Sequence, residues 1–217
     1  MPTTTGKKIA IVTGSALGLG YELASQLIAN GWLVAGVDFN AERQAELTAQ
    51  WPDDSYRAFV GDITDEAFVK ESVADIATLG HIDLLINNAG QPSFKVPTAY
   101  EAADVDKCLK GLKGMILWTV ETLKACGEQN VKIAQIMSTA ATRGNANEAC
   151  TAPPRWARRA IPRVCRPHTR APVSRWSPSI RAALIPLSTV TVATTSPRPS
   201  STPSCSPVRW PKSSSST

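Results

Sequence analysis

The composition of this chain changes abruptly after Glu148, and that change limits which part can form a folded core. Residues 149–217 contain no Gly, Asp, Glu, Phe or Tyr, but hold 12 of the 16 Pro, with 10 Arg and 13 Ser. Pro interrupts helices and central strands, and such a segment has no continuous apolar face to bury. We therefore expect residues 1–148 to form the folded domain. The Pro/Arg/Ser-rich segment 149–217 should be an irregular or disordered tail rather than a native domain.

The two parts also differ in charge. Residues 1–148 carry 12 Lys and Arg against 18 Asp and Glu, a net charge of −6, whereas residues 149–217 carry 11 basic and no acidic residues. A basic surface is typical of proteins that bind nucleic acid, and the Arg-rich segment 155–170 could contact phosphates non-specifically. Because the tail has no recognisable recognition motif, we expect no specific nucleic-acid partner.

Cysteine spacing and hydropathy exclude several other classes of protein. The five Cys are widely spaced and form no CxxC pair and no His-spaced cluster, which argues against a disulfide framework and a metal site. No apolar run approaches the roughly 18 residues of a membrane-spanning helix, and the run in residues 7–13 is too short for a signal peptide. We expect no membrane contact and a cytoplasmic location.

Short apolar runs alternate with helical patterns along residues 1–148. Buried strands are predicted at 8–13, 32–38, 56–62, 82–88 and 132–138. Helices are predicted from the glycine turn 14–20 to Asn30, at 41–50, at 65–79 with Thr64 as its cap, and at about 100–125. Apolar strands that alternate with helices indicate a parallel sheet covered on both faces. The prediction is an α/β fold with a doubly wound, Rossmann-type parallel sheet that is truncated after the fifth strand.

The end of this pattern has a consequence for the edge of the sheet. Residues 188–195 (STVTVATT) could form one strand at most, and the rest of the tail offers neither a helical nor a strand period. We therefore expect the strand at 132–138 to be an unpaired edge, and one face of the helix at 100–125 to be uncovered.

A glycine-rich turn, TGSALGLG at residues 13–20, directly follows the first strand and opens the first helix. Gly14 permits a tight turn, Gly18 lets the backbone approach a phosphate, and Gly20 lets the helix pack close to the sheet. Backbone N–H groups at the helix N-terminus would then face a pyrophosphate. The alternative is a purely structural turn between strand and helix.

Polar residues at the ends of the other strands favour the dinucleotide. Asp38 ends the second strand, where a carboxylate binds the ribose hydroxyls of NAD and repels the 2′-phosphate of NADP. Asp62-Ile63, Asn87-Asn88-Ala89-Gly90 and Ser138 end the third, fourth and fifth strands. Because the carboxyl ends of parallel strands line one crevice, these groups should converge. The expected cofactor is NAD in preference to NADP.

These motifs, in this order, make residues 7–148 resemble the short-chain dehydrogenase/reductase family. The resemblance implies an NAD(P)-dependent enzyme that interconverts an alcohol and a carbonyl compound, and intact relatives that form homo-oligomers. It also implies site roles. Gly14, Gly18, Leu19 and Gly20 would hold the pyrophosphate and its ribose, Asp62 and Ile63 would flank the adenine, Asn88, Ala89 and Gly90 would line the nicotinamide ribose, and Ser138 would be catalytic, bonding the substrate oxygen.

The chain departs from this family in two features. The family's YxxxK motif should follow Ser138, but Thr151 and Arg155 stand there, and none of Tyr21, Tyr56 and Tyr100 has a Lys four residues later. The family also places an Asn in the fourth helix where this chain has Gly111. The chain as written is therefore expected to be inactive.

A shift of reading frame explains the missing motif. Suitable codons for Cys150–Ala157 (CTAPPRWA) can be read in a shifted frame, in which the third base of each codon joins the first two bases of the next. In that frame they can encode Tyr-Cys-Ala-Thr-Lys-Val-Gly. The same shifted frame in Ser179–Pro186 permits a Pro-Gly segment typical of the family. We interpret residues from about 149 onward as an out-of-frame translation, or a sequencing error with the same effect. The alternative function is a non-catalytic dinucleotide-binding or regulatory protein with a basic disordered tail.

Overall fold

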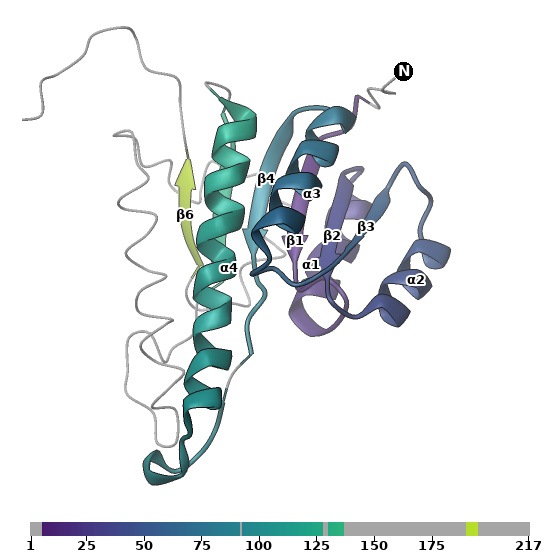
Figure 1. Ribbon diagram of the computed structural model, residues 1–217. Coiled ribbons are helices and arrows are strands. Elements are labelled where there is room, and N and C mark those ends of the chain that lie inside the picture. The colour runs from purple at the N-terminus through teal and green to yellow at the C-terminus, as the bar shows by residue number, and fades with distance from the viewer. Residues whose placement is uncertain (1–5, 92, 128–129, 137–189, 195–217) are drawn as a thin grey trace, which may run out of the picture.

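The chain forms one twisted sheet with helices on both faces (Figure 1). The computed structural model describes residues 6–91, 93–127, 130–136 and 190–194. Its strands are β1 (Ile9–Thr13), β2 (Leu33–Asp38), β3 (Tyr56–Val60), β4 (Ile82–Asn87), β5 (Lys132–Ile136) and β6 (Val190–Thr194). Its helices are α1 (Gly18–Ala29), α2 (Ala41–Gln50), α3 (Glu66–Leu79), the 3-10 helix η1 (Pro97–Ala99) and α4 (Ala102–Cys126).

The order of the strands confirms the doubly wound α/β fold. Among the described residues the sheet runs β3-β2-β1-β4-β5-β6, and β1 to β5 pair in parallel. Strand β1 pairs with β2 on one side and with β4 on the other, so the chain winds outward in both directions from β1. Thr13 at the end of β1 is in register with Val37 and with Asn87. The carboxyl ends of β1 and β4 therefore flank the point where the winding reverses, which is where such sheets bind ligands.

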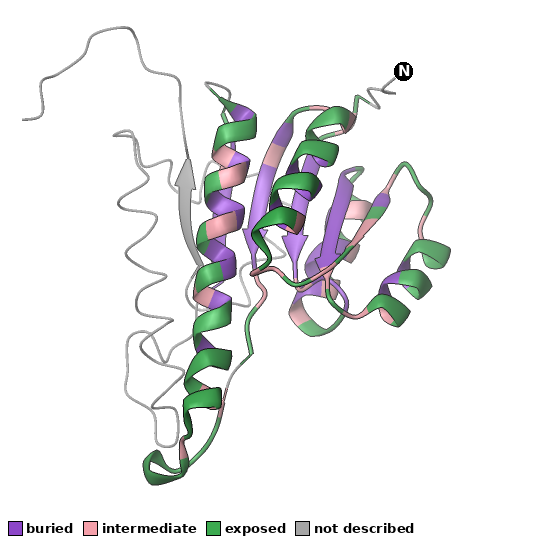
Figure 2. Cartoon of the chain, in the orientation of Figure 1, coloured by how far each residue is buried: buried purple, intermediate pink, exposed green. Residues whose placement is uncertain are grey.

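Two apolar layers hold the helices to the sheet. One layer joins α1 and α2 to alternate sheet residues, including Leu23, Leu47 and Val12, and the other joins α3 and α4 to the opposite face, including Ile76, Trp118 and Ile11. Strands β1, β2, β4 and β5 are buried almost throughout, β3 is partly exposed, and the outer faces of the helices are exposed (Figure 2). At roughly 25 cal/mol per Å² of apolar area, this two-sided burial is the main stabilising contribution.

The expectation of a bare edge at β5 is wrong. Strand β6, within the segment 188–195, pairs antiparallel with β5, with Ile133 opposite Ala193. The local sequence VTVAT is rich in β-branched residues and free of Pro, both of which favour a strand. The sequence of segment 188–195 allows one strand, but its pairing with β5 was not expected. The parallel part of the sheet does end at β5, and the rest of the proposed tail lies outside the described residues.

Two smaller expectations concern the helices. The cap of α3 is Asp65 rather than Thr64: the Asp65 carboxylate accepts hydrogen bonds from the backbone N–H groups of Ala67 and Phe68. On α4, four apolar side chains are partly exposed, as expected for a face that no described residue covers completely. Val105, Leu109, Ile116 and Val120, at helical spacing on one side, are 41%, 45%, 40% and 38% exposed.

Candidate functional site

The ends of β1 and β4 are joined by hydrogen bonds across the reversal point. The Thr13 hydroxyl accepts from the backbone N–H groups of Asn88 and Ala89, both at 3.1 Å. The Asn88 side-chain amide donates to the carbonyl oxygens of Thr13 and Gly14, again at 3.1 Å. The loop after β4 is therefore fixed against the glycine-rich turn, and Gly90 beyond it is exposed.

The glycine-rich turn needs glycine for different reasons at different positions. Gly14 and Gly18 have φ angles of 69° and 56°, in the region that other residues rarely adopt. A Cβ at Gly20 would lie 1.8 Å from the carbonyl oxygen of Gly14, so only glycine lets α1 start this close to the turn. A Cβ at Gly18 would meet no atom within 4 Å, so the backbone there faces open space. Leu19, between them, packs against the core on the α1 side.

Asp38 is tied to the same turn from β2. One carboxylate oxygen accepts from the backbone N–H of Ala16 at 3.1 Å, and the other from the backbone N–H of Asn40 at 3.0 Å. Arg43 on α2 donates from Nε to the carbonyl oxygen of Ala16 at 3.3 Å and pairs with Glu46. The carboxylate is thus held beside the turn with a fixed orientation, and each oxygen keeps capacity for a further hydrogen bond.

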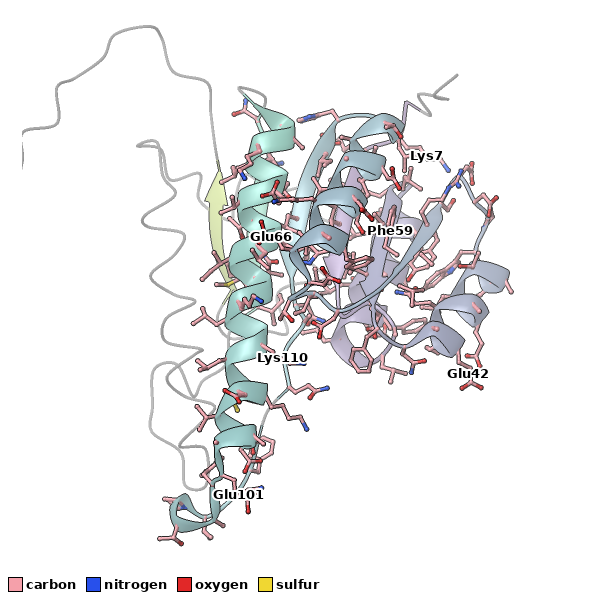
Figure 3. The ribbon with its side chains drawn as sticks, viewed as in Figure 1. Lys7, Glu42, Phe59, Glu66, Glu101 and Lys110 are labelled. Atoms are coloured by element: carbon pink, nitrogen blue, oxygen red, sulfur yellow. The ribbon has the colours of Figure 1, made fainter. Side chains whose placement is uncertain are left out.

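Asp62 and Ile63 lie in the loop after β3, which ends at Val60, and their contacts run toward α3 and α4. Asp62 Oδ1 accepts from the backbone N–H and hydroxyl of Thr64, both at 2.8 Å. Lys110, labelled in Figure 3, places its Nζ 3.3 Å from the other oxygen. These partners, the Thr64 N–H first, lower the pKa of Asp62. Ile63 packs on α4 where a Cβ at Gly114 would come within 2.5 Å of its Cδ1.

Other predicted residues contribute no side-chain hydrogen bond to the glycine-rich turn, or lie outside the described part of the chain. Asn87 faces the α4 layer, where its amide donates to the Thr119 hydroxyl at 3.1 Å. Gly111 is buried on α4 and offers no side chain for a proton relay. Ser138, Thr151 and Arg155 are outside the described residues.

Sequence reasoning missed a buried polar ring beneath the turn, formed by Ser15, Gln44 and Tyr56. Its signal in the sequence was Gly36, a glycine inside an otherwise bulky apolar strand. A Cβ there would lie 2.0 Å from the Tyr56 hydroxyl.

Two further findings concern metals and membranes. Within the described ranges, no group of three His, Cys, Asp or Glu side chains is placed to hold a metal ion. No helix in that part of the chain is long and apolar enough to cross a membrane.

Comparison with known proteins identifies the family. Residues 8–152 match the short chain dehydrogenase family. The chain belongs to this family. Its relatives include the NADPH-dependent 1-acyldihydroxyacetone phosphate reductase of Saccharomyces cerevisiae, 38% identical over 112 residues that cover 48% of this chain and 36% of that protein. Levodione reductase of Leifsonia aquatica is 32% identical over 151 residues, 66% of this chain and 56% of that protein.

A solved structure shares the fold. NAD+-bound xylitol dehydrogenase matches with a TM-score of 0.67 and 26% identity, over 72% of this chain and 63% of that one. The matched region thus spans 36% to 63% of the length of these three proteins. The family consists of oxidoreductases that bind NAD(P) and act on small molecules, and the matched region is the part that contains the glycine-rich turn.

The hydrogen bonds from Asn88 and Ala89 to the Thr13 hydroxyl, here called the Thr13 clamp, can be tested directly. Thr13→Val keeps the shape of the side chain but leaves the N–H groups of Asn88 and Ala89 without their acceptor. We expect a loss of about 2 kcal/mol of unfolding free energy, measured by urea denaturation. Thr48→Val, on the exposed side of α2, is the matched control and should change stability by less than about 0.5 kcal/mol. Equal losses in the two variants would contradict the clamp.

Proposed function

We propose that this chain derives from an NAD-preferring alcohol or carbonyl oxidoreductase, and that as written it binds the cofactor without catalysing turnover. The observation that supports the proposal most directly is the arrangement of the glycine-rich turn at the ends of β1 and β4. There Gly14, Gly18 and Gly20 keep side chains away from a backbone turn that the Asp38 carboxylate flanks.

The residues present fit a dinucleotide. A Cβ at Gly18 would meet no atom within 4 Å, so a phosphate could approach the backbone there, and the N-cap residue Leu17 makes no side-chain hydrogen bond to α1. Gly14, Gly18, Leu19 and Gly20 would hold the pyrophosphate end, and Asp38 would accept hydrogen bonds from the adenosine ribose. Asp62 and Ile63 would flank the adenine. Asn88, Ala89 and Gly90 would lie along the nicotinamide ribose. When bound, the nicotinamide supplies hydride transfer.

The chain lacks the residues that would transfer the proton in this reaction. An alcohol that loses hydride must also lose the hydroxyl proton, and a positioned base takes that proton. Ser138 would bond the substrate oxygen, but the Tyr and Lys of YxxxK are replaced by Thr151 and Arg155. We attribute this to an out-of-frame translation from about residue 149, so that residues 1–148 are the native domain and the rest is not.

A second function is favoured by the same deficiency. A protein that binds the dinucleotide but lacks the acid–base pair could serve as a non-catalytic or regulatory binding protein. Binding of NADH without turnover, together with capture of a specific partner that depends on residues 149–217, would favour this second function. Turnover of any alcohol or ketone would favour the enzyme.

Cofactor titration tests the proposal. We expect NADH to bind more tightly than NADPH, because the Asp38 carboxylate repels the 2′-phosphate. Asp38→Asn removes the charge at constant size and should reduce the ratio of the two dissociation constants about tenfold, which corresponds to about 1.4 kcal/mol. Fluorescence titration with both reduced cofactors gives the ratio.

Asp53→Asn is the matched control for this titration. It removes one exposed acid from the loop before β3. That loop lies at the amino ends of the strands, whereas Asp38 lies at the carboxyl end of β2, so the ratio should be unchanged. Tighter binding of NADPH than NADH by the unsubstituted chain would overturn the assignment of cofactor.

A further inference from the structure

Three side chains buried beneath the glycine-rich turn form a closed ring of hydrogen bonds. The Tyr56 hydroxyl donates to Gln44 Oε1 at 2.6 Å, and Gln44 Nε2 donates to Ser15 Oγ at 3.1 Å. Since the single proton of Tyr56 is already used, Ser15 donates to the Tyr56 oxygen, at 3.1 Å, and closes the ring. All three residues are 0% exposed.

Every donor of the ring has an acceptor. The second N–H of Gln44 goes to the carbonyl oxygen of Gly36 at 3.1 Å. Burial raises the pKa of Tyr56, so its hydroxyl remains a donor at any physiological pH. A satisfied buried network is rigid and specifies one arrangement, whereas a network with one member missing leaves the others without partners.

The ring joins three separate elements at the turn. Ser15 lies in the turn itself, Gln44 is on α2 and Tyr56 starts β3. The next residue in the turn, Ala16, contacts Asp38 through its N–H and Arg43 through its carbonyl oxygen. The backbone N–H groups of Gly14 and Ser15 both point to the carbonyl oxygen of Val37. The turn is thereby attached to β2 by its backbone and to α2 and β3 by the Ser15 side chain.

The Tyr56 side chain fits against the sheet only because residue 36 is a glycine. Tyr56 reaches across β2 to Ser15, and a Cβ at Gly36 would lie 2.0 Å from its hydroxyl and 2.3 Å from the ring carbon that bears it. A glycine in a central strand weakens the strand, and here the space it leaves is filled by the phenol. The phenol hydroxyl thus crosses β2 at Gly36 and reaches Ser15 in the turn.

We infer that Ser15, Gln44 and Tyr56 are positioning residues that hold the glycine-rich turn in its cofactor-binding conformation and so set the affinity for the dinucleotide. The inference rests on the proposed binding of NAD at this turn. None of the three side chains is exposed to touch the cofactor. They act through the backbone of Ser15 and Ala16, and through the orientation of Asp38 that Ala16 fixes.

The test uses the full chain and two independent measurements. Tyr56→Phe keeps the aromatic ring but removes the donor to Gln44, and Ser15→Ala opens the ring of hydrogen bonds from the turn side. In the cofactor-free protein, both variants should speed hydrogen exchange of the amides of residues 14–20. In titrations with NADH, both should raise the dissociation constant about fivefold, the equivalent of one neutral hydrogen bond.

Leu47→Val is the matched control. Leu47 lies one turn after Gln44 on α2, is fully buried in the same apolar layer and takes no part in the ring. This variant should lower the melting temperature to a similar extent while leaving both exchange at residues 14–20 and the NADH affinity unchanged. If Leu47→Val weakens NADH binding as much as Tyr56→Phe does, the ring is only structural and the inference is overturned.

The remaining outcomes separate this inference from the proposed function. Unchanged exchange and unchanged NADH affinity in Tyr56→Phe would overturn the inference and leave the proposed function intact. Faster exchange with unchanged NADH affinity would also overturn the inference, because a loosened turn would then bind NADH as well as the ordered one. Absence of NADH binding by the unsubstituted chain would reject the proposed function, and the inference with it.

Discussion

Restoring the reading frame around codons 145–152 is expected to raise the turnover of alcohols and ketones about 10²–10⁴-fold over that of the chain as written, the range attributed to a positioned general acid or base. The restored segment would supply the Tyr that exchanges a proton with the substrate oxygen and the Lys that lowers its pKa. In the present chain Thr151 and Arg155 stand at those positions, and neither replaces the pair. The measurement is the NAD(H)-dependent rate of both proteins against a panel of small alcohols and ketones.

Two controls assign the gain to the acid–base group. A restored protein whose YxxxK tyrosine is replaced by phenylalanine should fall back to the rate of the present chain while still binding NADH. Ser138→Ala in the restored protein should also lower turnover with little change in NADH affinity, because Ser138 would bond the substrate rather than the cofactor. Comparable rates for the present and restored proteins would show that the interpretation of the tail is wrong.

Most of the sheet could be predicted from the sequence because the pattern is local. Each of the five parallel strands is a short apolar run, and each helix follows a turn signal or a cap, so period and composition suffice. The boundaries were less certain: the third strand was predicted to reach residue 62 but ends at Val60. The cap of α3 depends on which of two adjacent polar side chains turns back onto the helix, and sequence alone does not fix that choice.

The candidate site was only partly predictable, since motifs give positions and not contacts. The convergence of the glycine-rich turn, Asp38 and Asn88 follows from the rule that parallel strands end at one edge of the sheet. The engagement of Asp62 by Thr64 and Lys110 did not follow, because Lys110 is 48 residues away in the chain. The pairing of β5 with β6 is more distant still: the sequence of 188–195 allows a strand, but nothing local in it specifies β5 as its partner.

Gly20→Ala is expected to cause the largest loss of stability among single substitutions in the turn, about 3 kcal/mol or more. The new Cβ would sit 1.8 Å from the carbonyl oxygen of Gly14 and 2.7 Å from Asn88 Nδ2. Both atoms belong to the hydrogen bonds that join the turn to the loop after β4, since Asn88 donates to that same carbonyl oxygen. A backbone oxygen cannot rotate away as a flexible side chain can, so α1, the turn and the loop after β4 must separate.

Gly18→Ala is the informative comparison, because its cost has a different origin. A Cβ at Gly18 meets nothing within 4 Å, but the residue has a φ of 56°, so only the left-handed backbone conformation is penalised, by about 1–2 kcal/mol. Urea denaturation followed by tryptophan fluorescence gives both values. Gly20→Ala must then be the more damaging variant, even though Gly18 has the unusual backbone angle. The reverse order would mean that α1 does not start as close to the turn as the 1.8 Å approach requires. That result would contradict the geometry on which the proposed dinucleotide site rests.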